Sequence, residues 1–120
     1  MNRILIVDDE ESIRRSLAGI LSDEGFETDS VADGESELTA LRQGDEVPEV
    51  VLVDIAMPGR DGVEILAEIR RAWPGLPVVM MSGHGTIETA VRATQLGAFD
   101  FIEKPLSLEK LLLTLRHALD

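Results

Sequence analysis

The sequence contains no cysteine and no tyrosine, and aromatic residues make up 3% of its 120 positions. Without cysteine, the chain can form no disulfide, bind no metal through thiolates and use no thiol nucleophile. One tryptophan and three phenylalanines leave few rings on which nucleic-acid bases or a flavin could stack. The chemistry of this chain must therefore come from its carboxylate, hydroxyl and amine groups.

Long hydrophobic runs and positive charge are also scarce. No apolar run approaches the roughly 20 residues needed to span a bilayer, and the opening "MNRILIVDDE" lacks the apolar core and cleavage site of a signal peptide. Eleven basic residues stand against 23 acidic ones, for a net charge of −12. Such a surface repels phosphate backbones and anionic lipids. We expect a cytoplasmic protein that binds neither nucleic acid directly nor membranes.

Hydrophobic runs and helical periods alternate five times along the chain. The predicted strands are residues 3–7, 26–31, 50–53, 76–81 and 99–102, and the predicted helices are residues 10–24, a segment after Asp33 that ends at Gly44, 62–73, 86–96 and a segment after Ser107. Strands with continuous apolar runs, such as "RILIV", are typical of a parallel sheet covered on both faces. The pattern predicts one α/β domain with right-handed crossovers.

Local signals define the ends and the faces of these helices. Gly25 and Gly97 follow helices where a left-handed residue is favoured, and Asp33 and Ser107 are predicted N-caps. The fourth helix is predicted to carry one face of Ile87, Ala90, Val91 and Thr94, and the last helix a buried stripe of Leu108, Leu111, Leu112, Leu115 and Leu119.

Polar residues follow four of the predicted strands. Asp8 and Asp9 come after the first, Asp54 after the third, Ser82 after the fourth, and Lys104 after the fifth. In an open parallel sheet, ligands bind beyond the carboxyl ends of the strands. A lone aspartate there is usually a turn former. Four strand ends that deliver complementary groups to one edge instead predict a shared site.

Three crowded carboxylates need a counter-charge. Two unit charges about 4 Å apart cost about 4 kcal/mol at an effective dielectric near 20. A divalent cation, Lys104 or protonation of one acid could relieve this repulsion. An all-oxygen set with open positions suits magnesium, which readily shares a phosphate ligand. A nucleophilic carboxylate, a cation, an amine and a hydroxyl are the groups that phosphoryl transfer requires.

Four stretches carry a specific resemblance: "ILIVDDE", "VLVDIAMPGRDG", "VVMMSGHG" and "DFIEKP". In this order and spacing they resemble the signature blocks of the bacterial response-regulator receiver domain, along essentially the whole chain. The resemblance implies a flavodoxin-like, doubly wound five-stranded parallel sheet of order 2-1-3-4-5 with five helices. It also implies a phosphorylation-dependent switch in a two-component system rather than an enzyme, catalysing only its own phosphorylation and dephosphorylation.

The resemblance assigns a role to each matching position. Asp54 would accept a phosphoryl group from a sensor kinase phosphohistidine. The reaction would require Mg²⁺, for which Mn²⁺ could substitute. The metal would be held by Asp9, Asp54, the carbonyl of Ala56 and, through water, Asp8. Lys104 and Ser82 would contact the phosphoryl oxygens, and Ser82 and Phe101 would form the conformational switch. The Lys104–Pro105 peptide bond would be cis. Ala56 and His84 would modulate the lifetime of the phosphorylated state. Phe101, unlike a tyrosine, has no hydroxyl that could form a hydrogen bond to a partner. Ala56 cannot orient an attacking water, so we expect slow dephosphorylation.

The stretch "SGHGTIETAVRATQLGAFDFIEKP" resembles in particular the receivers of nitrogen-regulation, sigma-54-dependent activators. We expect residues 1–120 to form one receiver domain with no effector domain, cut from a longer transcription regulator. A stand-alone receiver or phosphorelay intermediate is the alternative. The face formed by the fourth helix, fifth strand and fifth helix is a candidate for homodimerisation.

Three other classes share parts of this pattern. A flavodoxin-like electron carrier would need a phosphate loop rich in Gly, Ser and Thr where this chain has "DDEES". An aspartyl phosphohydrolase would need a second acid two residues after Asp54, where this chain has Ala56. A receiver-shaped interaction module that is never phosphorylated would not need the complete set of site residues.

Overall fold

The structure, a computed structural model, describes residues 2–43, 47–54, 62–83, 87–104 and 106–120. Strands and helices alternate within these residues. In chain order they are β1 (Arg3–Val7), α1 (Glu11–Asp23), β2 (Glu27–Val31), α2 (Gly34–Gln43), β3 (Val50–Asp54), α3 (Gly62–Ala72), β4 (Val78–Ser82), α4 (Ile87–Gln95), β5 (Asp100–Glu103) and α5 (Leu108–Leu119). The sheet is parallel with strand order β2-β1-β3-β4-β5, which confirms the predicted doubly wound topology.

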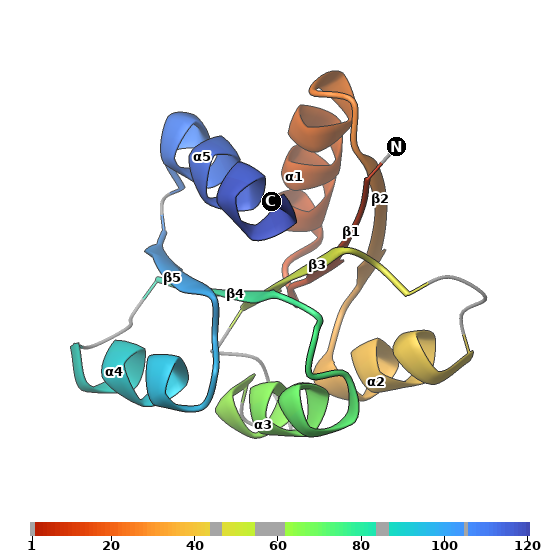
Figure 1. Ribbon diagram of the computed structural model, residues 1–120. Coiled ribbons are helices and arrows are strands. Elements are labelled where there is room, and N and C mark those ends of the chain that lie inside the picture. Colours follow the sequence, from red (N-terminus) through yellow and green to blue (C-terminus); the bar gives the residue numbers. More distant parts are fainter. Residues whose placement is uncertain (1, 44–46, 55–61, 84–86, 105) are drawn as a thin grey trace.

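The helices cover both faces of the sheet, as Figure 1 shows, with α1 and α5 on one side and α2, α3 and α4 on the other. Each strand alternates its side chains between the two layers, because successive residues of a strand point to opposite faces. In β3, Val51 and Val53 pack into the core beneath α2, α3 and α4, whereas Val50 and Leu52 pack into the core beneath α1 and α5. This double burial explains why the strand sequences are apolar without interruption.

Strand register brings the ends of β3 and β4 to the same edge of the sheet. Asp54 pairs with Met81, and Ser82 pairs with Glu103. Asp54 and Ser82 are therefore the last residues of their strands, not the first residues beyond them as predicted. The sequence boundary was wrong because an acid or a hydroxyl at a strand end still contributes its backbone N–H and C=O to the ladder.

The predicted helix caps at Gly25, Gly97 and Ser107 are confirmed, although α1, α3 and α4 each end one residue earlier than predicted and α1 begins one residue later. Gly25 and Gly97 adopt φ of +92° and +101°. After α1, the N–H of Gly25 donates to the carbonyl of Ser22, and the N–H of Phe26 donates to the carbonyl of Leu21. These are the two hydrogen bonds of a Schellman motif. Ser107 Oγ accepts from the N–H of Lys110 at 3.4 Å at the start of α5. The predicted end of α2 at Gly44 lies outside the described residues.

Two predicted helix faces need correction. Among the α4 residues whose burial the structure describes, Ala93 is fully buried, while Val91 is 49% exposed and Thr94 is also exposed. In α5, Leu111 and Leu115 are buried as predicted, but Leu108 is 47% exposed. Sequence spacing shows which apolar residues share a helix face, but it does not show which of two adjacent faces packs against the sheet. Within the described residues, no helix is both long and apolar enough to cross a membrane.

Candidate functional site

Asp8, the residue after β1, is held in place by groups from several parts of the chain. Its backbone N–H donates to the carbonyl of Val31 at 3.2 Å, which extends the pairing of β1 with β2. Its carboxylate Oδ1 accepts the N–H of Glu10 at 2.9 Å, and its backbone carbonyl accepts Nη1 of Arg14 at 2.8 Å. The side chain is fully buried. A buried carboxylate with this many partners is a fixed acceptor rather than a solvated charge.

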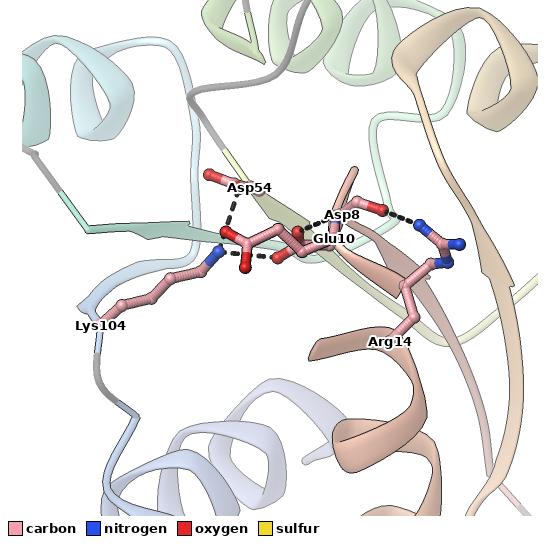
Figure 2. A network of polar contacts seen from close by, with 5 residues as sticks. All are labelled: Asp8, Glu10, Arg14, Asp54 and Lys104. Carbon is pink, nitrogen blue, oxygen red and sulfur yellow. Dashed lines mark hydrogen bonds and ion pairs between the residues drawn. The ribbon is translucent and has the colours of Figure 1, made fainter. Parts of the chain in front are cut away.

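Lys104 joins the first and third strands at this edge, as Figure 2 shows. Its Nζ lies 2.7 Å from Oδ2 of Asp8 and 3.0 Å from Oδ2 of Asp54, and only 14% of its side chain is exposed. Its own backbone N–H donates to the carbonyl of Ser82 at 2.8 Å, so the ladder between β4 and β5 continues to the residue that carries the ammonium group. The predicted convergence of Asp8, Asp54, Ser82 and Lys104 is therefore present.

Asp9 completes a cluster of three acids. Among the described residues, Asp8, Asp9 and Asp54 each offer a carboxylate oxygen within 4.8 Å of the others. Asp8 and Asp54 are buried and Asp9 is exposed, so the cluster opens to solvent at one side. Within the residues that the structure describes, the Lys104 ammonium group contacts two of these three carboxylates, so the acids outnumber the ammonium charge that pairs with them. An all-oxygen, partly open and negatively charged set fits a hard divalent cation such as magnesium.

The pKa of Lys104 reflects these surroundings. Burial lowers the pKa of its ammonium group, but the hydrogen bonds and negative charges of Asp8 and Asp54 raise it by more, so the pKa lies above its ordinary value of 10.5. Lys104 is therefore fully charged at neutral pH. A permanent cation between two buried carboxylates is suited to bind an anionic group that approaches Asp54.

The two predicted switch residues lie on neighbouring strands. Ser82 is 2% exposed at the end of β4. Phe101, in the centre of β5, pairs with Met80 and packs partly buried against the core beneath α2, α3 and α4. Phe101 thus has one side in the core and the other toward solvent. Its predicted rotation remains a prediction.

Some predicted site residues fall outside the described residues, and one contact was not foreseen. Ala56, His84 and Pro105 lie in the segments that are not described. Arg14, which binds the backbone carbonyl of Asp8, was not predicted. One signal was present, a basic residue six positions after Asp8 on the first turn of a predicted helix, but a backbone acceptor has no signature of its own in a sequence.

Comparison with known proteins agrees with this geometry. The family model of the response regulator receiver domain matches residues 4–116. The chain therefore belongs to the response regulator receiver domain family. Solved structures of CheY-like receiver domains share the fold, for example that of the protein from Methanospirillum hungatei, with a TM-score of 0.93 at 32% identity over 100% of this chain and 94% of that one.

Similar proteins include a regulator of nitrogen assimilation. The nitrogen assimilation regulatory protein NtrX of Azorhizobium caulinodans is 45% identical over 122 residues, which cover 98% of this chain and 26% of that protein. The crystal structure of the receiver domain of NtrX from Brucella abortus is 52% identical, with a TM-score of 0.89 over 97% of each chain. The chain spans 24–26% of the length of the curated relatives that it matches here.

A dimeric receiver is also among the similar structures. The solution structure of the beryllofluoride-activated NtrC4 receiver domain dimer is 39% identical to this chain, with a TM-score of 0.88 over 99% of this chain and 97% of that one.

Proposed function

We propose that this receiver domain is a phosphorylation switch in which Asp54 accepts a phosphoryl group from the phosphohistidine of a sensor kinase. The observation that supports this most is the position of Lys104, whose Nζ contacts both Asp8 and Asp54 within 3.0 Å in a largely buried setting. A stabilising surface ion pair would not need a third acid beside it. Here Asp9 adds one, which leaves negative charge for a cation to neutralise.

The proposed step has a simple balance. A carboxylate oxygen of Asp54 attacks the phosphorus, the N–P bond of the phosphohistidine breaks, and the imidazole nitrogen leaves with the electron pair. Lys104 then pairs with a phosphoryl oxygen, and the hydroxyl of Ser82 donates to another. Asp9 and Asp54 would hold Mg²⁺ directly, with Ala56 through its carbonyl and Asp8 through water. When bound, the metal offsets charge on the transferring phosphoryl oxygens.

The proposed output is a change of the surface around Phe101. Movement of Ser82 toward the phosphoryl group would leave space into which the partly buried ring of Phe101 can turn. The surface of α4, β5 and α5 would then change its affinity for an effector. By similarity to NtrX, we propose an effector in sigma-54-dependent transcription, in a longer chain. A stand-alone receiver or phosphorelay intermediate is the alternative.

Acetyl phosphate offers a direct test of the acceptor. Incubation with acetyl phosphate and magnesium should add one phosphoryl mass to the wild-type protein, measured by intact mass spectrometry. Asp54→Asn should gain none. Asp29→Asn is the matched control, because Asp29 is an exposed aspartate whose loss should leave the reaction unchanged. Equal phosphorylation of Asp54→Asn and wild type would refute the assignment.

Homodimerisation through the face of α4, β5 and α5 is a second proposal. The helices that border this face carry exposed apolar side chains, and Val91 of α4 and Leu113 of α5 are 49% and 53% exposed. Sedimentation should show a shift toward a dimer on addition of beryllofluoride and magnesium. Leu113→Glu should abolish the shift, and Val47→Glu, at an equally exposed position before β3, should not. A shift that survives Leu113→Glu would exclude this face.

A further inference from the structure

Arg14 approaches the acid cluster from α1, and neither the proposed phosphoryl transfer nor the proposed metal site uses it. Its Nη1 donates to the backbone carbonyl of Asp8 at 2.8 Å, and its side chain is partly buried. In Figure 2, Arg14 and Lys104 lie on opposite sides of Asp8. Lys104 binds the carboxylate of Asp8, whereas Arg14 binds its main chain.

The contacted carbonyl belongs to the peptide unit that joins Asp8 to Asp9. Because a peptide unit is planar, fixing its carbonyl oxygen also fixes the direction in which the chain enters Asp9. Asp9 needs such support, since it is the exposed member of the cluster, whereas Asp8 and Asp54 are buried. The carboxylate of Asp8 is already fixed by Glu10 N–H and Lys104, so the bond from Arg14 acts chiefly on the peptide that follows.

We infer that Arg14 is a positioning residue that orients the Asp8–Asp9 peptide and thereby sets the affinity of the acid cluster for a divalent cation. This inference rests on the proposed function, since it assigns a role toward the metal that the switch would use. Groups that orient metal ligands typically contribute a factor of about 10 to 100 in metal affinity. A long cationic side chain that binds only a backbone carbonyl belongs at the lower end of that range.

A general effect of positive charge is the rival explanation, and the chain contains a matched control for it. Arg15 is the next residue of α1, carries the same charge and is exposed. Arg14→Ala and Arg15→Ala remove the same charge from the same helix turn. Only Arg14→Ala removes the hydrogen bond to Asp8. Arg14→Lys retains the charge and one donor group.

The experiment measures Mg²⁺ affinity by calorimetry for wild type and the three variants, with thermal unfolding in EDTA as the folding control. We expect Arg14→Ala to weaken Mg²⁺ binding about 10-fold. Arg15→Ala should weaken it less than about 2-fold, because an exposed charge is screened by salt. Arg14→Lys should fall between wild type and Arg14→Ala. In metal-free protein, amide hydrogen exchange at Glu10 should be faster in Arg14→Ala than in wild type or Arg15→Ala, because a loosened Asp8–Asp9 peptide also loosens the following turn, in which the N–H of Glu10 donates to the Asp8 carboxylate.

Equal weakening in Arg14→Ala and Arg15→Ala would overturn the inference and leave only a charge effect, while the proposed function would stand if the wild type binds Mg²⁺ and is phosphorylated. Failure of the wild type to do either would overturn both. If Arg14→Ala does not fold, Arg14→Lys decides. In that case, weaker magnesium binding and faster Glu10 exchange in a folded Arg14→Lys than in wild type would support the role of Arg14, and values that match wild type would overturn it. If Arg14→Ala folds, unchanged values in that variant would overturn the role of Arg14.

Discussion

Two ion clusters in this domain have nearly the same composition and geometry but very different surroundings. Across the β1–β2 strand pair, Arg3 contacts Glu27 at 3.0 Å and Asp29 at 2.7 Å. The side chains of Arg3, Glu27 and Asp29 are 31%, 45% and 58% exposed. At the carboxyl edge, Lys104 contacts Asp8 at 2.7 Å and Asp54 at 3.0 Å, with side chains 14%, 0% and 6% exposed. In each cluster one cation contacts two carboxylates, which lie on the same strand, β2, around Arg3 and at the ends of two strands, β1 and β3, around Lys104.

The difference in solvent exposure gives the two clusters different effects on stability and different functions. Exposed ion pairs contribute about 0–1 kcal/mol, because water and salt already stabilise the separate charges. The cluster around Arg3 is therefore suited to a charged edge strand, β2, which discourages pairing with other chains. In the buried cluster, water cannot replace a missing partner, and Asp9 adds a further negative charge. That imbalance costs stability and prepares the site for a cation and a phosphoryl group.

The largest expected difference between the clusters concerns the central cation. Lys104→Met removes the ammonium group that two buried carboxylates share and should lower the free energy of unfolding by about 3 kcal/mol in metal-free buffer. Arg3→Met should lower it by about 1 kcal/mol at most. Urea denaturation with circular dichroism measures both. Similar losses in the two variants would contradict the distinction between the buried and exposed clusters.

The aspartates should respond with opposite signs. Asp54→Asn removes one of three crowded carboxylates and should raise the free energy of unfolding by about 1 kcal/mol without metal, as expected where a site residue trades stability for function. Asp29→Asn removes an exposed partner of Arg3 and should change it by no more than about 0.5 kcal/mol. The same denaturation assay applies. A clear loss of stability in Asp54→Asn would mean that the cluster is not electrostatically strained.

Alkaline titration should isolate the contribution of Lys104. Because its folded-state pKa is raised above 10.5, the stabilisation from this residue is fully present below pH 10.5 and is lost as pH rises through the folded-state pKa. The stability gap between wild type and Lys104→Met should shrink in that range in metal-free buffer. The background is favourable, because the chain has no cysteine or tyrosine and Lys110 is its other lysine. A gap that stays constant well above pH 10.5 would argue against the raised pKa.

Added salt should produce the smallest change in the free energy of unfolding, but it should act on the exposed cluster and hardly on the buried one. The Debye length falls to about 3 Å at 1 M salt, so exposed pairs are screened and buried pairs much less. The loss caused by Arg3→Met, small already, should approach zero in 1 M NaCl. The loss caused by Lys104→Met should largely persist. Equal salt sensitivity would show that water reaches both clusters alike.

Sequence patterns were most informative where both faces of an element are buried. The runs "ILIV" and "VVLV" predicted central strands because only an element covered on both sides can be apolar at every position. The order of the strands and the roles of the site residues came from family resemblance instead. The convergence of Asp8, Asp54 and Lys104 followed from the rule that parallel strands end at one edge.

Patterns were least informative where packing depends on a distant partner. In α4, Val91 and Ala93 both fit a helical period, and only the tertiary structure shows that Ala93 contacts the core while Val91 faces solvent. The prediction for Leu108 was wrong for a related reason, since its spacing fits the buried stripe of α5 but only the tertiary structure shows that this first residue of the helix is 47% exposed. Arg14 was missed because its acceptor is a main-chain carbonyl, which every residue has.

Magnesium titration followed by two-dimensional amide NMR tests the central claim most directly, because it examines both ion clusters in one experiment. Saturable shifts with one-to-one stoichiometry should occur at Asp9, Asp54 and Lys104, while Glu27 and Asp29 should change little. Non-saturating shifts of similar size at both clusters would show that magnesium only screens a strongly acidic surface, and would contradict a cation site at the carboxyl edge of the sheet.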